Sequence, residues 1–526
     1  MNVDDIDWGS EDARNLRLRT PDQVDIFLGS YVLPAKFKLA DFLNGYRYFV
    51  FGGKGAGKTA LLQYIRIKAE EKLGATASFF YFQSSFSKND LQAFLTNTAK
   101  ANDRVVDDSG LSDPEEAFLF WRIFLLAEVA MLLKRAGVAE GPAAEFIKAI
   151  EAARLIAKAK NVAKRYPSLQ RFSVELSKDA KFQLEGTFES ATVSDLSTYL
   201  HIAEDKLRGV FLENTPLFLF IDEMEVFIRG DETDALRLGA IAALVRAVRD
   251  FNETFRDNDI RVIAAIRDVV VEQVSTVQGE ISRIIRDNGV AVDWPLSAKE
   301  GFHPLERMVL GRIVMQDAKL KQLRNGDFDS AIAQASKMYF PQDGSLRGSL
   351  NLTWYRPRDM ALLFDEAATI DSGKGSFSSY TLTDGVVKPL GKRLWEDAIS
   401  GLAVKYGKQE LDGVERLLRG GKDIYSREEL LNRMEELSHS YDEVAILSDS
   451  HKWMAVIEDL YRAGALYTIA KVSGKKNFAF RGDSMPSLTD DFRVGVHQVL
   501  LKHLSIRQGA TNDRVYRSPS PRLPRR

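Results

Sequence analysis

The sequence predicts an α/β fold in which a parallel sheet is flanked by helices. Parallel strands are buried on both faces, so they read as continuous apolar runs without polar alternation. Three such runs occur, at residues 46–51, 217–221 and 261–266. The first is followed by a glycine-rich stretch and then by helix-forming residues 60–65. The other two end in charged pairs, as strands do where they emerge at the ligand-binding edge of a sheet.

The glycine-rich stretch fits the pattern G-x-x-x-x-G-K-T in full. Its residues, all expected to bind phosphate together with Ala60 at the helix start, are Gly52, Gly53, Lys54, Gly55, Ala56, Gly57, Lys58 and Thr59. Glycines allow successive N–H groups to turn toward phosphate oxygens, and the helix N-terminus adds its positive dipole end. Lys58 is expected to reach the β- and γ-phosphates, and Thr59 to bind Mg²⁺. The strand–loop–helix context favours a nucleoside triphosphate site over a chance glycine-rich turn.

The pair Asp222-Glu223 ends the second apolar run, which is the Walker B pattern. Asp222 is expected to hold the water shell of Mg²⁺, and Glu223 to polarise the attacking water as a catalytic residue. A strand that ends in Asp-Glu is common by itself, but beside a complete P-loop it indicates a hydrolytic site.

Arginines supply further candidate catalytic residues. Arg267 ends the third run, where P-loop ATPases carry a polar sensor of the γ-phosphate; an ordinary ion pair with Asp268 or Glu272 explains it equally well. Residues 280–286 have a helical pattern with Arg283 and Arg286 on one face. One of these two arginines is a candidate finger for a neighbouring subunit, and surface ion pairing is the alternative.

The composition is that of a globular protein. The 526 residues are 45% hydrophobic and 28% charged, with no cysteine, which excludes disulfides and cysteine-ligated metals. The formal net charge of −2 gives no overall sign of nucleic-acid binding. The first residues lack a signal-peptide pattern, and no apolar run approaches the roughly 20 residues of a membrane span. We therefore expect a cytoplasmic protein without a membrane partner.

The P-loop and the Asp222-Glu223 pair are separated by far more than the roughly 30 residues of a simple βαβ unit. A strand at residues 78–82 is predicted between them, followed by helices at 114–134 and 143–165. Trp121, Phe124, Leu125 and Leu132 are predicted core residues of this insertion. The predicted domains are an N-terminal segment 1–45, a P-loop domain 46–300 with a helical insertion at about 100–215, a helical lid 301–412, a winged helix 413–512 and a basic disordered tail 513–526.

The chain resembles P-loop ATPases of the AAA+/STAND type with a C-terminal winged helix, the branch that includes origin-recognition and initiator ATPases. More closely, it resembles a family of bacterial P-loop ATPases. The stretches that carry this resemblance are residues 8–13, 51–59, 354–359 and 496–502. The resemblance implies ATP and Mg²⁺ as cofactors, oligomer formation, and a context in bacterial anti-phage defence. The sequence lacks an NKxD guanine-reading motif, which also favours ATP.

The same resemblance implies that residues 356–359 open a lid helix. Arg358 then has a sensor-2-like contact to the β- and γ-phosphates, and Pro357 lies near the adenosine; an ordinary helix start with exposed arginines is the alternative. Ring-forming AAA+ enzymes have Asn, Ser or Thr where this chain has Arg267. This departure favours a STAND-like nucleotide switch over a processive motor. An ABC-type signature is absent from the sequence, since residues 176–179 fit it poorly.

The predicted winged helix contains a capping box at Ser426, a helix at 453–463 and a hairpin with strands at 465–470 and 477–481. Its 14 Lys and Arg balance its 14 Asp and Glu, whereas a DNA-reading module normally has a basic excess. We therefore expect a lid or protein-contact module, although Lys471, Lys475 and Lys476 keep DNA contact open.

Two functions follow from the sequence. The first is a Mg²⁺-dependent ATPase that acts as a switch or assembly platform for a partner protein, either a further copy of this chain or a separate effector. The alternative is a DNA-binding initiator or regulator ATPase that uses the winged helix and the arginine-rich tail. The six histidines show no metal-ligand spacing.

Overall fold

The computed structural model describes residues 1–16, 18–82, 114–159, 193–212, 215–224, 234–294, 301–324, 326–340, 345–403, 405–449, 452–481, 483 and 492–507. The predicted tail, residues 176–179 and parts of the predicted insertion lie outside these ranges. The chain divides into two compact units. The P-loop unit contains residues 9–315 and 356–358, and the C-terminal unit contains residues 1–8, 316–355 and 359–526.

The P-loop unit is built on a five-stranded parallel sheet with the order β2-β3-β4-β1-β5. Its strands are β1 (Phe49–Gly52), β2 (Thr76–Tyr81), β3 (Leu217–Asp222), β4 (Ile260–Arg267) and β5 (Gly289–Ala291). Every residue of β3 and the first seven residues of β4 are buried. The predicted α/β class is therefore confirmed. The three apolar runs correspond to β1, β3 and β4, the strand predicted at 78–82 corresponds to β2, and β5 was not predicted.

Alternate residues of the central strands enter two separate cores, one on each face of the sheet. In β4, Ile263 and Ala265 join one core, and Val262, Ala264 and Ile266 join the other. The first core is covered by α2 (Leu39–Leu43) and α3 (Lys58–Leu73), and the second by α11 (Asp234–Thr254), α12 (Asp268–Val277) and α13 (Glu280–Asp287). Helices α1 (Pro21–Ser30) and α14 (Pro304–Gln316) complete the described helices of this region.

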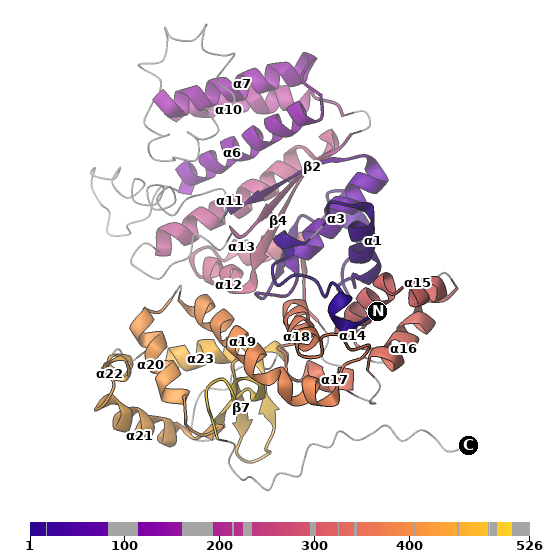
Figure 1. Ribbon diagram of the computed structural model, residues 1–526. Helices are drawn as coiled ribbons and strands as arrows, with labels where there is room; N and C mark the ends of the chain where they lie inside the picture. The colour runs from indigo at the N-terminus through magenta and orange to yellow at the C-terminus, as the bar shows by residue number, and fades with distance from the viewer. Residues whose placement is uncertain are drawn as a thin grey trace. The chain divides into compact units, whose positions relative to one another are not determined.

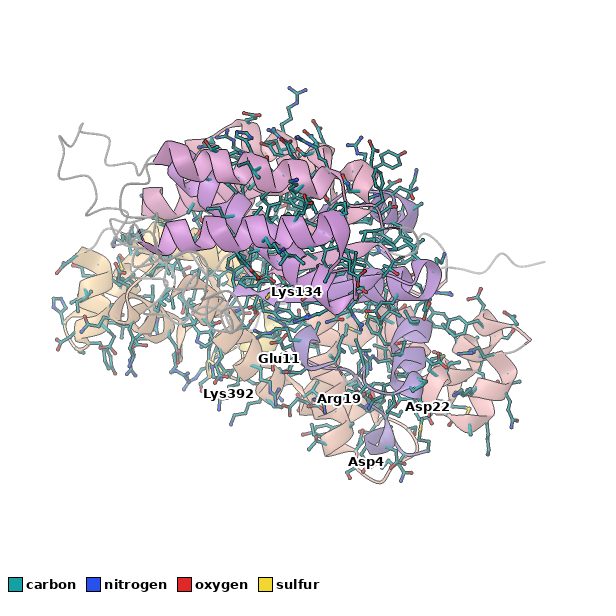
Figure 2. All side chains as sticks on the ribbon, turned by 90° about the horizontal axis from the view of Figure 1, so that it is seen from above. Asp4, Glu11, Arg19, Asp22, Lys134 and Lys392 are labelled. Atoms are coloured by element: carbon teal, nitrogen blue, oxygen red, sulfur yellow. The ribbon has the colours of Figure 1, made fainter. Side chains whose placement is uncertain are left out.

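The predicted helical insertion extends the second core. Helices α6 (Pro114–Arg135), α7 (Gly141–Ala159) and α10 (Val193–Arg208) form a stack next to α11 (Figure 1). Trp121 is fully buried, and its Nε1 donates to the Ala240 carbonyl of α11 at 2.8 Å. At the outer side, Lys134 of α6, labelled in Figure 2, donates to Glu151 of α7 at 3.1 Å. The predicted core residues Trp121, Phe124, Leu125 and Leu132 are all buried.

The C-terminal unit takes its first residues from the N-terminus of the chain. The Trp8 ring lies 5.3 Å from Phe364 and 5.4 Å from Phe377, and its Nε1 donates to the Val3 carbonyl at 3.0 Å. The helices of this unit are α15 (Ala318–Arg324), α16 (Phe328–Tyr339), α17 (Ser345–Leu350), α18 (Pro357–Ile370), α19 (Val387–Leu402), α20 (Lys408–Leu418), α21 (Arg427–Ser438), α22 (Asp442–Asp449) and α23 (Trp453–Ala463). Helix α18 begins at the predicted Pro357, and its first two residues belong to the P-loop unit.

A small antiparallel sheet with the order β6-β9-β7-β8 completes the C-terminal unit. Its strands are β6 (Ile424–Tyr425), β7 (Leu466–Ala470), β8 (Lys476–Asn477) and β9 (Phe492–Val496). The Ser426 capping box with Glu429 is present at the start of α21, as predicted. Helix α23 and strand β7 occur where the winged-helix prediction expects them, and the assignment of a winged helix stays a prediction.

The second strand of the hairpin is shorter than predicted. Only Lys476–Asn477 pairs with β7, and Ala479–Arg481 forms a 3₁₀ helix. The Phe478 N–H donates to Asp483 Oδ2 at 3.1 Å, and the Phe478 ring stacks on Tyr467 at 5.0 Å. Phe478 therefore forms these two interactions where the β7–β8 pairing ends. In the part of the chain that the structure describes, no helix has both the length and the apolar character that crossing a membrane requires.

Asp371 generates a testable prediction on stability. Its side chain is 1% exposed, and it accepts hydrogen bonds from Lys374 Nζ at 2.6 Å and the Ser378 N–H at 2.8 Å. Burial by itself raises the pKa of this carboxyl, but the bonds from Lys374, Ser378 and Thr381 outweigh it and lower the pKa below 3.8. The Asp371 carboxylate therefore stabilises the fold above the pKa of the unfolded chain, and this contribution is lost as the pH falls through the lowered pKa.

We expect Asp371→Asn to lower the free energy of unfolding by about 1–3 kcal/mol at pH 7, because a charged acceptor of a buried network is lost. Calorimetric melting measures this loss, and the difference from the unsubstituted protein should shrink below about pH 4. Asp365→Asn, an exposed position of α18, is the matched control and should leave melting unchanged. An equal loss at pH 7 and pH 3 would contradict the role of the charge.

Candidate nucleotide-binding site

The glycine-rich loop joins β1 to α3, and two of its glycines are required by the backbone geometry. A Cβ on Gly52 would lie 2.7 Å from the Val292 carbonyl oxygen, closer than real Cβ contacts. Gly57 precedes the first residue of α3 with φ +99°, a left-handed conformation that strains other residues. The loop therefore has the tight turn and the close backbone approach that a phosphate cradle needs.

Lys58 is the first residue of α3 and is 8% exposed. Its Nζ donates to the carbonyl oxygens of Gly52 and Gly53, both at 2.9 Å. The ammonium group thus lies over the start of the loop. To reach a bound phosphate as predicted, Lys58 has to exchange these carbonyl bonds for phosphate oxygens.

Thr59 and Asp222 lie together at the carboxyl edge of the sheet. The Thr59 hydroxyl donates to Asp222 Oδ2 at 2.5 Å, and Asp222 Oδ1 accepts the Glu223 N–H at 2.8 Å. Hydroxyl and carboxylate oxygens are the hard donors that Mg²⁺ prefers, with substrate phosphate and water completing its coordination. The described residues contain no group of three or more His, Asp or Glu that could hold a metal. The oxygen atoms of Thr59 and Asp222 are thus of the donor type that Mg²⁺ prefers.

Glu223 has a backbone φ of +65°, an unusual value for a residue other than glycine. Its Oε1 pairs with Arg14 Nη1 at 2.7 Å, with side chains 15% and 32% exposed, respectively. Arg14 is also held by Asp12, through Nε at 2.7 Å and the Arg14 N–H at 3.0 Å. Burial raises the pKa of Asp12, but the hydrogen bonds and charge of Arg14 and the charge of Arg358 outweigh it and lower that pKa.

The carboxylates of Asp222 and Glu223 also affect the pKa of Tyr81, the last residue of β2. Burial, followed by the negative charge of Asp222, raises the pKa of Tyr81 to about 12. The phenol is therefore neutral at physiological pH, and it accepts a hydrogen bond from Gln63 Nε2 at 3.2 Å. Tyr81 thus adds a neutral polar group to this edge of the sheet.

Residues 356–358 pack against the loop within the P-loop unit. Arg356 Nη1 donates to the Lys54 carbonyl at 3.0 Å, and Arg358 Nε donates to the Glu11 carbonyl at 2.9 Å. A Cβ on Gly57 would lie 3.6 Å from Pro357 Cγ. The structure therefore brings the predicted Pro357 and Arg358 to the loop, in addition to Arg356.

Arg267 ends β4 directly beside the loop, because its Cα is the register partner of Gly52. It is the residue that precedes α12. Asp268 lies on the same side, with Oδ2 3.8 Å from the position of a Cβ on Gly53. The position of Arg267 is compatible with a sensor, and a structural ion-pairing role remains the alternative.

Arg283 and Arg286 lie on the exposed side of α13, and Arg283 forms an ion pair with Asp287 at 3.3 Å. This is the surface pairing that the sequence left open as an alternative. A finger role in a neighbouring subunit stays a prediction for both residues.

Three contacts of the loop region were missed from the sequence. These are the Arg14–Glu223 ion pair, the Arg356 bond to Lys54, and the bond from Trp294 Nε1 to the Ala56 carbonyl at 2.9 Å. Each joins residues that are distant in the chain and carries no local pattern. The only available signal was the position of Arg356 beside the predicted Arg358.

The strand order and the loop define the class: the chain has the α/β fold of P-loop nucleoside triphosphatases, with β4 between the P-loop strand β1 and the Walker B strand β3. No protein-family profile matches the sequence, and no curated protein matches it. Among solved structures, the crystal structure of Cdc6p from Pyrobaculum aerophilum is similar over 94% of this chain and 97% of its own, with 11% sequence identity and a TM-score of 0.28.

Gly57 provides a test of the loop geometry. We expect Gly57→Ala to weaken nucleotide binding about five- to tenfold, because alanine in a left-handed conformation costs roughly 1 kcal/mol or more and shifts the loop. Gly53→Ala is the matched control within the loop: its nearest contact to an added Cβ is 3.8 Å away and its φ is not left-handed. Equilibrium titration with a fluorescent nucleotide measures both variants. Equal affinities for the two variants would contradict the strain argument.

Proposed function

We propose that this protein is a Mg²⁺-dependent ATPase that works as a nucleotide-controlled switch or assembly platform for a partner protein. The observation that carries the proposal is the meeting of Thr59, Asp222 and Glu223 at one edge of the sheet, next to the loop that carries Lys58. A metal-holding oxygen pair and a neighbouring carboxylate are what hydrolysis of a bound phosphate anhydride requires.

Each residue has a distinct role in the proposed reaction. The backbone N–H groups of residues 52–60 hold the phosphates, and Lys58 stabilises the charge that develops on the β- and γ-phosphate oxygens. Thr59 and Asp222 hold Mg²⁺, which neutralises phosphate charge when bound. Glu223 orients a water molecule for attack on the γ-phosphorus and accepts its proton. Arg267 and Arg358 contribute further positive charge near the phosphates. Arg283 or Arg286 acts as an arginine finger that contacts the γ-phosphate bound by a neighbouring copy of the chain.

A switch is favoured over a motor because the sensor position holds Arg267 and because the 413–512 region has no net charge. We propose that residues 301–412 act as the lid, that residues 413–512 form a winged helix for protein contact, and that the protein is cytoplasmic. The family resemblance supports a role in bacterial anti-phage defence, with a separate effector or further copies of this chain as partners.

DNA binding is the second candidate, and the exposed hairpin tip favours it. Val472 is 98% exposed, and lysines surround it in the β7–β8 hairpin. Lys475 lies 3.7 Å from Asp483, and Lys476 lies 5.3 Å from the Tyr467 ring centroid, so part of this charge is already compensated. The protein-partner switch therefore remains the first candidate.

Glu223→Gln tests the hydrolytic assignment. We expect it to lower the turnover of Mg-ATP by about 10²-fold or more while ATP stays bound, because the water loses its proton acceptor but the phosphate cradle is intact. Lys58→Ala should instead abolish nucleotide binding. Steady-state hydrolysis together with equilibrium titration separates the two effects. Turnover retained in Glu223→Gln would exclude Glu223 as the base.

Salt-dependent DNA affinity separates the two candidate functions. We expect no duplex binding near physiological salt with ATP present, because the winged-helix region has no basic excess to replace counterions. Fluorescence anisotropy on the full chain and on a chain shortened by residues 514–526 measures this. Tight binding that falls steeply with salt and is lost on shortening would favour the DNA-directed ATPase.

A further inference from the structure

The carboxylate proposed as the base is already engaged by the N-terminal part of the P-loop unit. Arg14 Nη1 lies 2.7 Å from Glu223 Oε1. Asp12 orients the guanidinium, because its carboxylate accepts a hydrogen bond from Arg14 Nε at 2.7 Å. The guanidinium is therefore held by Asp12 on one side and by Glu223 on the other. An arginine whose orientation is fixed by one carboxylate presents a hydrogen-bond donor in a fixed position to a second carboxylate, here Glu223.

The N-terminal residues next to Arg14 also contact Arg358, another candidate residue of the site. The Glu11 carbonyl accepts a hydrogen bond from Arg358 Nε at 2.9 Å. Glu11 and Arg19, both labelled in Figure 2, flank Arg14 in the sequence. Residues 11–14 therefore bond both to Glu223, which follows β3, and to Arg358 in α18. A shift of this segment changes both contacts.

We infer that Arg14 is a positioning residue that restrains Glu223 and holds hydrolysis at a low rate until the ion pair rearranges. The inference rests on the proposed ATPase function. A carboxylate that accepts a hydrogen bond from a guanidinium is a weaker proton acceptor than one that faces water alone. When the ion pair opens, Glu223 is released toward the attacking water and the site becomes active.

Arg14→Gln in the full chain tests the restraint. Because partly exposed ion pairs are weak, we expect kcat for Mg-ATP to rise about three- to tenfold, with the affinity for a non-hydrolysable ATP analogue unchanged within about twofold. Arg14→Lys keeps a cation and should stay near the unsubstituted kcat. Arg19→Gln, at an exposed arginine five residues further along the chain, is the matched control. An unchanged or lower kcat in Arg14→Gln would overturn the inference.

Two further variants separate this role from a structural one. Asp12→Asn weakens the anchor of Arg14 and should raise kcat in the same direction by a smaller factor, which keeps the test available if Arg14→Gln does not fold. Arg14→Gln combined with Glu223→Gln should be as slow as Glu223→Gln alone, because the restraint acts through Glu223. A faster double variant would show that Arg14 acts elsewhere and would overturn the inference.

The same measurements distinguish failure of the inference from failure of the proposed function. Hydrolysis by the unsubstituted protein without a rise in Arg14→Gln overturns only the role of Arg14. ATP binding without hydrolysis in either protein overturns the proposed ATPase and the restraint together.

Discussion

The hydrogen bond from Thr59 to Asp222 is the interaction on which the candidate site depends. It links the start of α3 to the end of β3, although β4 separates β1 from β3 in the sheet. The parallel register of β1, β3 and β4 brings all three carboxyl ends to one edge, which is why a hydroxyl from the loop can meet a carboxylate two strands away. The loop, Thr59, Asp222 and the strand-end Arg267 are therefore positioned by one sheet.

The sequence was sufficient for features that depend on neighbouring residues. Strands β1, β3 and β4 were recognised because each is an apolar run, and the P-loop because eight consecutive residues have a fixed pattern. The short strand β5 has no such run and was not predicted. The Ser426 capping box is a local pattern of the same kind. In each case the physical cause acts within a few residues, so the pattern can be read without knowledge of the fold.

Features that depend on tertiary contacts could not be read in this way. The pairing of Glu223 with Arg14 arises only when the N-terminal segment meets the residue that follows β3. The bonds from Lys58 to the loop carbonyls depend on the folded loop itself. In the shortened β8, the bond from the Phe478 N–H to Asp483 joins residues only five apart, but it is not part of the strand pattern from which the hairpin was predicted.

The P-loop unit is discontinuous in the chain, and this has a consequence for its synthesis. Residues 356–358 belong to it although residues 316–355 do not. Ribosomes build a chain from its N-terminus, and domains generally fold as their residues emerge. The loop therefore cannot gain the Arg356 bond to the Lys54 carbonyl until the chain has been made as far as residue 356. A fragment that stops at residue 315 lacks this contact, so the glycine-rich loop gains its full set of contacts only late in translation.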